Sequence, residues 1–121
     1  MILVNNLNSL RRLIMVCKNK DVSFVPAGEN VTRKVLAHDG KMLCAEVHFV
    51  KGAIGAPHTH PHEQIGYVVK GSFELTIEGE TTVITEGDSY YTAPDQIHGV
   101  VALTDGILLD VFTPQREDFL K

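Results

Sequence analysis

Short runs of apolar and β-branched residues follow one another through most of the chain, separated by turn-forming residues. From residue 42 onward these runs cover 42–50, 65–69, 72–78, 81–86, 88–93, 99–103 and 107–113. Glycine or proline recurs at positions 52, 55, 57, 71, 79, 87, 94, 99 and 106. Such short spacing is typical of antiparallel hairpins in a barrel or sandwich. The pattern therefore predicts an all-β domain without a long helix.

The clearest hairpin lies at residues 72–85, where apolar and polar side chains alternate. Phe73, Leu75 and Ile77 share one face of its first strand, so we expect this face to be buried. The sequence Glu-Gly-Glu at 78–80 is the expected connection.

Residues 107–113 carry apolar side chains on both faces of the expected strand. Ile107, Leu109 and Val111 alternate with Leu108, Asp110 and Phe112. A strand that is apolar on both faces must be covered twice, and one small barrel covers only one face. We therefore expect a partner subunit, and hence a homodimer.

Composition limits the function classes. The chain has 121 residues, 44% of them hydrophobic, which suffices for the core of one domain. The formal net charge of -4 and the lack of basic clusters beyond Arg11-Arg12 and Arg33-Lys34 argue against nucleic-acid binding. No apolar run is long enough to span a membrane, and residues 1–14 lack the pattern of a signal peptide. We expect a cytoplasmic protein.

The two ends of the chain are expected to lie outside the sheets. Residues 1–21 are expected to be an N-terminal extension, either flexible or dimer-forming, and residues 22–121 to be the barrel domain. After Pro114 we expect a short terminal helical turn, with Thr113 as its cap. Cys17 and Cys44 belong to no C-x-x-C pattern, which predicts buried free thiols.

Histidine and glutamine form the most informative pattern in the chain. His58 and His60 make an H-x-H pair, whose imidazoles point to one face of an extended segment because strand side chains alternate. Gln64 adds an amide oxygen and His98 a third imidazole. This nitrogen-rich set suits zinc, nickel, iron, copper or manganese rather than calcium. We predict a metal site at these four residues, with His62 at its rim.

The spacing of these residues resembles the two motifs of the cupin family. From Gly52 to Gly71 the order G-x5-H-x-H-x3-[E/Q]-x6-G is kept throughout. The second motif, at 87–99, lacks the usual glycine after the proline and is one residue shorter between proline and histidine. The resemblance implies a single cupin barrel, the double-stranded β-helix or jelly roll. With Gln64 in place of the commoner glutamate, neutral ligands would leave the metal a stronger Lewis acid.

Residues 22–120 further resemble the KdgF-type pectin-degradation cupins, through Gln64, the sequence HPHEQIGYVVKGSFELTI and the tail LLDVFTPQREDF. This resemblance implies an enzyme that converts 4,5-unsaturated monouronates, small carbohydrates released by polysaccharide lyases, into linear 5-keto-4-deoxyuronate. It implies that Asp110, Phe112 and Arg116 lie beside the metal. We expect one divalent transition metal per chain, zinc or nickel first, with iron, manganese, copper or cobalt as alternatives.

The implied reaction needs proton transfer and stabilisation of oxyanion charge, but no redox step. Asp110 is the candidate proton shuttle, Arg116 offers a planar donor fork to a carboxylate, and Phe112 shapes an apolar wall. Two alternatives without a catalytic role stay open. Asp110 could be a buried structural carboxylate held by backbone amides or by Arg116, and Arg116 could lie on the surface beside Glu117 and Asp118.

Tyr67, Tyr90 and Tyr91 are expected to be ordinary strand residues, with Tyr67 facing away from the ligands.

Two other functions fit the same ligand set. A cupin dioxygenase would hold iron, copper or nickel, but an O₂ reaction with a neutral aromatic substrate requires neither Asp110 nor Arg116. A non-catalytic barrel would bind a sugar or uronate as a sensor or store, although no fused regulatory domain is recognisable in 121 residues.

Overall fold

The all-β prediction is confirmed by a computed structural model, which describes residues 15–121. The expectations for residues 1–14 fall outside this range. The strands are β1 (Val25–Pro26), β2 (Val31–Asp39), β3 (Met42–Phe49), β4 (Ile54–His58), β5 (Glu63–Lys70), β6 (Ser72–Ile77), β7 (Glu80–Thr85), β8 (Ser89–Thr92), β9 (His98–Ala102) and β10 (Gly106–Thr113). Two single 3-10 turns, η2 (Asn19–Asp21) and η3 (Glu117–Phe119), flank them.

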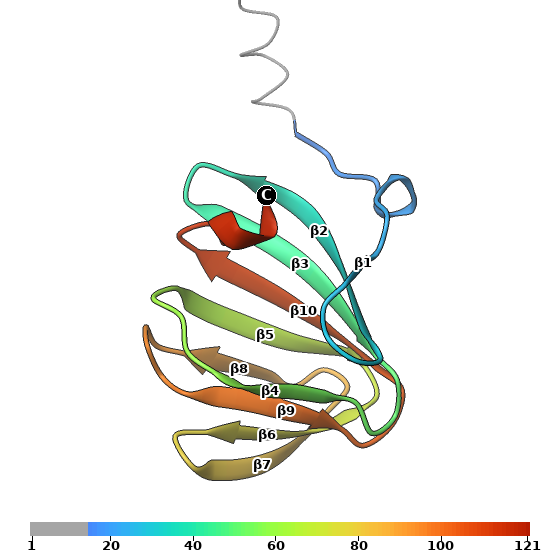
Figure 1. Cartoon of the computed structure of the whole chain (residues 1–121), viewed down its shortest axis with the longest axis vertical. Coiled ribbons are helices and arrows are strands. Elements are labelled where there is room, and N and C mark those ends of the chain that lie inside the picture. The colour runs from blue at the N-terminus through green and yellow to red at the C-terminus, as the bar shows by residue number, and fades with distance from the viewer. Residues whose placement is uncertain (1–14) are drawn as a thin grey trace, which may run out of the picture.

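The strands form two antiparallel sheets (Figure 1). One has six strands in the order β1-β2-β3-β10-β5-β8, and the other has four in the order β4-β9-β6-β7. Because strands close in sequence lie in different sheets, the chain crosses repeatedly between the two layers, as a jelly roll requires. Apolar side chains from both layers meet between them.

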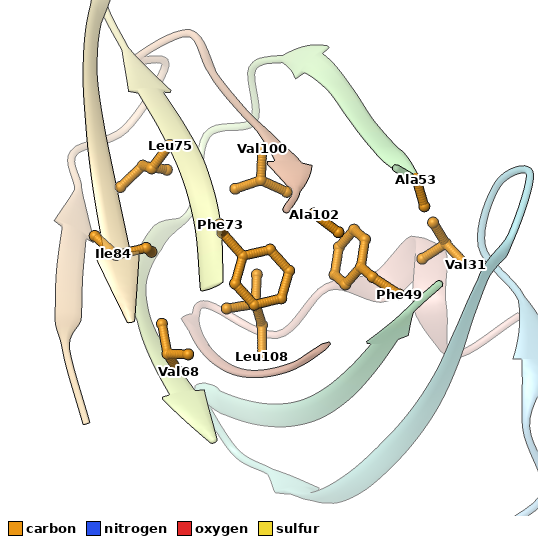
Figure 2. Packing of buried hydrophobic residues seen from close by; sticks show 10 residues of the cluster. All are labelled: Val31, Phe49, Ala53, Val68, Phe73, Leu75, Ile84, Val100, Ala102 and Leu108. Atoms are coloured by element: carbon orange, nitrogen blue, oxygen red, sulfur yellow. The ribbon is translucent and has the colours of Figure 1, made fainter. Parts of the chain in front are cut away.

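The β6–β7 hairpin confirms the expected pairing and carries much of the core. Its turn is Glu78-Gly79, with φ of 49° and 81°, so the connection has two residues and Glu80 already belongs to β7. Phe73 is fully buried and packs edge-to-face on Phe49, with 5.2 Å between ring centroids. Figure 2 shows Phe73 amid the other apolar side chains of this core cluster, among them Phe49, Val68 and Leu108.

Strand β10 lies between β3 and β5, and the two sheets cover only one of its two apolar faces. Leu108, Asp110 and Phe112 are buried between the sheets. The opposite face, with Ile107, Leu109 and Val111, is half-buried. The buried face therefore brings Asp110 into the interior, where its neighbours across the sheet are Ala45 on β3 and Gly66 on β5.

Several expectations for the ends of the chain need correction. Thr113 is the last residue of β10 and caps nothing: η3 begins at Glu117, with Arg116 preceding it and no side-chain cap. The thiols of Cys17 and Cys44 are free but half-buried rather than buried.

Strand β2 was not predicted, and Lys34 on it donates to the backbone and side-chain oxygens of Asn19. No helix within residues 15–121 has the length and apolar character needed to cross a membrane.

Candidate metal centre

Three histidines converge on one point, with His60 and His98 buried and His58 exposed. His58 ends β4 and His98 begins β9, and the two residues are paired across the sheet. His60 lies in the loop after β4, so the H-x-H pair continues beyond the strand instead of lying wholly on it. One ligand nitrogen from each of the three lies within 4.8 Å of the others. This is the spacing of groups that can share one ion.

The Nδ1 nitrogen of each of the three rings lies within hydrogen-bond distance of a backbone carbonyl oxygen. The Nδ1 atoms of His58, His60 and His98 lie 3.0, 3.1 and 2.9 Å from the carbonyl oxygens of Ala56, His62 and Gln96, respectively. A carbonyl can only accept, so these contacts place a proton on each Nδ1 and leave the Nε2 lone pairs free. The backbone thus selects the tautomer that a metal requires.

Two further observations show that the site fits a cation. Within the described part of the chain, the buried Nε2 atom of His98 has no hydrogen-bond partner. The Nε2 atom of His60 lies 3.0 Å from Oε1 of Gln64, which places two electron-pair donors face to face once Nδ1 carries the proton. Burial, reinforced by the other histidines, lowers the pKa of His98 to about 4, and burial also lowers the pKa of His60. Neutral imidazoles are therefore ready to bind a metal near neutral pH.

Gln64 connects the histidines to Asp110. Its Nε2 donates to Oδ1 of Asp110 at 3.0 Å, while its Oε1 faces His60. Burial raises the pKa of the Asp110 carboxyl to about 7, against the opposing effects of the Gln64 hydrogen bond, Arg116 and Arg33. Within residues 15–121 Asp110 forms no ion pair with Arg116. The side-chain partner of Asp110 is therefore a metal-ligand candidate, and among the described residues neither backbone amides nor Arg116 hold it as the structural alternative required.

Tyr90 was treated as an ordinary strand residue, yet it lines the same cavity. It pairs with Gly66, and a Cβ atom at Gly66 would lie 2.3 Å from the Tyr90 ring, so only glycine leaves room for it. Its hydroxyl is 3.5 Å from Nε2 of Gln64. Burial and the Asp110 charge raise the Tyr90 pKa well above its usual value, so the phenol keeps its proton. The signal in the sequence was the glycine two residues after Gln64.

Two aromatic and two cationic side chains also line the cavity: Phe112, Phe119, Arg33 and Arg116. Phe112 packs edge-to-face on His60 and on Phe119, at 5.5 and 5.7 Å between centroids. The Arg116 side chain is only 12% exposed and lines the cavity, so the alternative of a free surface position does not hold, although Asp118 is its partner. Its Nε and Nη2 donate to the two carboxylate oxygens of Asp118 at 3.0 and 2.9 Å. Arg33, which was not predicted, lines the cavity from β2.

The cavity has a volume of about 280 Å³ and includes His58, His98 and Asp110 in its lining. That volume lies just below the range for drug-sized ligands and suits one sugar ring rather than a polymer. His62 stands next to this region, because its ring packs edge-to-face on His60 and Phe112 and its Nε2 bonds the carbonyl of Gln115. Tyr67 is exposed on the outer face of β5, as predicted.

Comparison with known proteins agrees with this geometry. A family model described as "Cupin domain" matches residues 45–112. The chain is 46% identical over 95 residues to the pectin degradation protein KdgF of Dickeya dadantii (strain 3937), a match that covers 77% of this chain and 86% of that protein. The chain belongs to the cupin family and resembles its KdgF members.

Solved structures of cupins show the same likeness. The structure of KdgF from Halomonas sp. aligns with a TM-score of 0.83 at 36% identity, covering 87% of this chain and 97% of that one. An RmlC-like cupin from Shewanella frigidimarina NCIMB 400 gives the same TM-score and identity, over 86% of this chain and 94% of the other. The predicted family and fold are thereby confirmed.

Proposed function

We propose that this cupin converts 4,5-unsaturated monouronates into linear 5-keto-4-deoxyuronate. The observation that carries the proposal is the position of Asp110: a buried carboxyl lies in a sugar-sized cavity, one amide group away from three converging histidines. The relative from Dickeya dadantii, a pectin degradation protein by name, supports a substrate derived from a uronate polymer.

The reaction is an isomerisation, so no external reagent is needed. The ring bond between C1 and the ring oxygen breaks: the C1 hydroxyl gives up its proton as C1 becomes an aldehyde, and the ring oxygen takes a proton and becomes the hydroxyl of a C4=C5 enol. The enol hydroxyl then loses its proton while C4 gains one. The product is the 5-ketone. Two demands fall on the protein: it must stabilise negative charge on the departing oxygen, and it must move a proton to carbon.

His58, His60, Gln64 and His98 would hold one divalent transition metal, with zinc or nickel as first choices. When bound, the metal supplies a Lewis acid that stabilises negative charge on a substrate oxygen. Asp110 would hold the transferred proton, and Gln64 fixes the orientation of its carboxyl by donating to Oδ1. Phe112 would pack against the sugar ring, and Arg116 would add positive charge near the substrate carboxylate.

The test is absorbance at the band of the unsaturated uronate, after mixing metal-loaded protein with lyase-generated monouronates. We expect wild type to accelerate loss of the band and Asp110→Asn to lose at least 100-fold in rate while still binding sugar. Arg116→Ala is expected to raise KM or lower kcat, and an unchanged Arg116→Ala would remove that residue from the site. No acceleration with any uronate or metal would favour a dioxygenase or a binding protein instead.

A homodimer is part of the same proposal. Next to the half-buried outer face of β10, the outward side chains of β5 are exposed: Ile65 is 53% and Tyr67 44% accessible. The two strands are neighbours in the six-stranded sheet, so their outer faces form one apolar surface. A second copy of the chain would cover it.

A further inference from the structure

Arg33 occupies a position where the strand pattern calls for an apolar side chain. Val31 and Val35 lie two residues to either side of it on β2. Val31 belongs to the apolar core around Phe73, and the half-buried Val35 packs against a second cluster formed by Leu43, Ala45 and Phe112. Arg33 shares the parity of these two valines, and it lines the cavity together with Asp110, Phe112 and Arg116. A cation on the inner face of a strand is costly unless something offsets its charge.

The two arginines of the cavity stack on one ring. The Cζ atom of Arg33 lies 3.7 Å from the centroid of Phe119, and the Cζ atom of Arg116 lies 4.2 Å from it. Stacking fixes the plane of a guanidinium and leaves its N–H edge free to bind a planar anion. Phe119 therefore fixes the orientation of both guanidinium groups.

The donors of the two arginines are used differently. Arg116 is engaged by Asp118 through two parallel hydrogen bonds. Within residues 15–121 Arg33 forms no ion pair, and its buried Nε has no hydrogen-bond partner. Asp118 is thus committed to Arg116, and the guanidinium of Arg33 keeps an N–H donor free for a further anion. Burial and the neighbouring Arg116 lower the Arg33 pKa, against the opposing charges of Asp118 and Asp110.

We infer that Arg33 is the principal carboxylate-binding residue of the cavity, and that it receives the anionic group of the ligand on the free edge of its guanidinium. Arg116, held by Asp118, acts beside it mainly by charge and position. The identification of this anion as the carboxylate of an unsaturated uronate rests on the proposed function. The anion site itself does not.

The test compares a charged sugar with its neutral ester. D-galacturonate and its methyl ester are titrated calorimetrically into the zinc-loaded full chain, for wild type, Arg33→Gln and the exposed control Lys70→Gln. We expect Arg33→Gln to weaken galacturonate binding about 10- to 100-fold, the usual worth of a charge-assisted pair, while ester binding changes less than twofold. Lys70→Gln should bind both sugars as wild type does.

Other outcomes would overturn the inference. If Arg33→Gln weakens the binding of galacturonate and of its ester equally, Arg33 only shapes the cavity. If wild type binds the ester as tightly as the acid, the cavity has no carboxylate site. If Arg33→Gln fails to fold, Arg33→Lys keeps the charge but not the fork, and wild-type discrimination in that variant would also contradict the inference. Arg33-dependent discrimination without turnover of unsaturated uronates would refute the reaction and leave the anion site standing.

Discussion

Replacement of Asp110 by asparagine should stabilise the metal-free protein at neutral and higher pH. The carboxyl is 8% exposed, and burial raises its pKa from 3.8 to about 7. Below pH 4 the group is protonated in both the folded and the unfolded chain, so it carries no penalty. As the pH rises from 4 to 7, the unfolded chain releases this proton more readily, and the free energy of unfolding falls.

The magnitude follows from the size of the shift. Each pKa unit is worth about 1.36 kcal/mol, so the full penalty above pH 7 is about 4 kcal/mol. Asparagine does not titrate, and its side-chain oxygen can still accept from Nε2 of Gln64, the donor that Asp110 uses. Asp110→Asn should therefore gain up to about 4 kcal/mol on wild type between pH 4 and pH 8.

Urea unfolding at half-unit pH steps, with a chelator present, measures this difference. The chelator matters because a bound cation beside Gln64 would favour the ionised carboxylate and hide the penalty. The exposed Asp21→Asn is the matched control and should follow wild type throughout. A gap between wild type and Asp110→Asn that stays constant from pH 4 to 8 would refute the assignment of Asp110 as a carboxyl with a raised pKa.

Three further predictions test the metal centre, the core and the outer surface. His60→Ala should hold well under one equivalent of zinc per chain after dialysis, measured by elemental analysis, because it removes one of three converging nitrogens; retention of a full equivalent would disprove the ligand set. Phe73→Ala should lose about 3–5 kcal/mol of unfolding free energy in urea, because it empties a fully buried site, whereas Val83→Ala, at 57% exposure, should change by less than about 0.5 kcal/mol. Tyr67→Lys should shift sedimentation from dimer to monomer, with Val83→Lys on the other sheet as control; a monomeric wild type would end the dimer proposal.

The sequence predicted what periodicity and spacing determine. The β6–β7 hairpin follows from strict alternation and a turn that glycine closes, and β10 follows from its two apolar faces. The three histidines that could hold a metal were found because H-x-H and a distant histidine form a spaced motif. None of these required knowledge of contacts between remote strands.

Strand β2 and Arg33 escaped prediction for one physical reason. The inner face of β2 carries an arginine among valines, so alternation is broken where the strand passes the cavity. Arg33 is stabilised there by Phe119, which lies 86 residues later in the chain. Tyr90 was missed similarly, because its place depends on the space above Gly66 in a strand paired with its own. Tertiary contacts decide such positions, and local pattern does not record them.

Gln64 and Asp110 are best understood as one feature of the site. An ionised glutamate at position 64 would offer only acceptors, whereas the amide offers an oxygen toward His60 and an N–H toward Asp110, each at 3.0 Å. Glutamate would also set a second negative charge against a buried carboxyl, which raises the cost of ionising either. The departure from the commoner cupin glutamate is therefore what allows a carboxyl to stand beside the candidate metal ligands. A neutral amide would also leave the positive charge of a bound metal uncompensated, so that the metal could stabilise negative charge on a substrate oxygen. Glutamine at position 64 would therefore support both parts of the proposed reaction, the proton transfer by Asp110 and the stabilisation of the oxyanion.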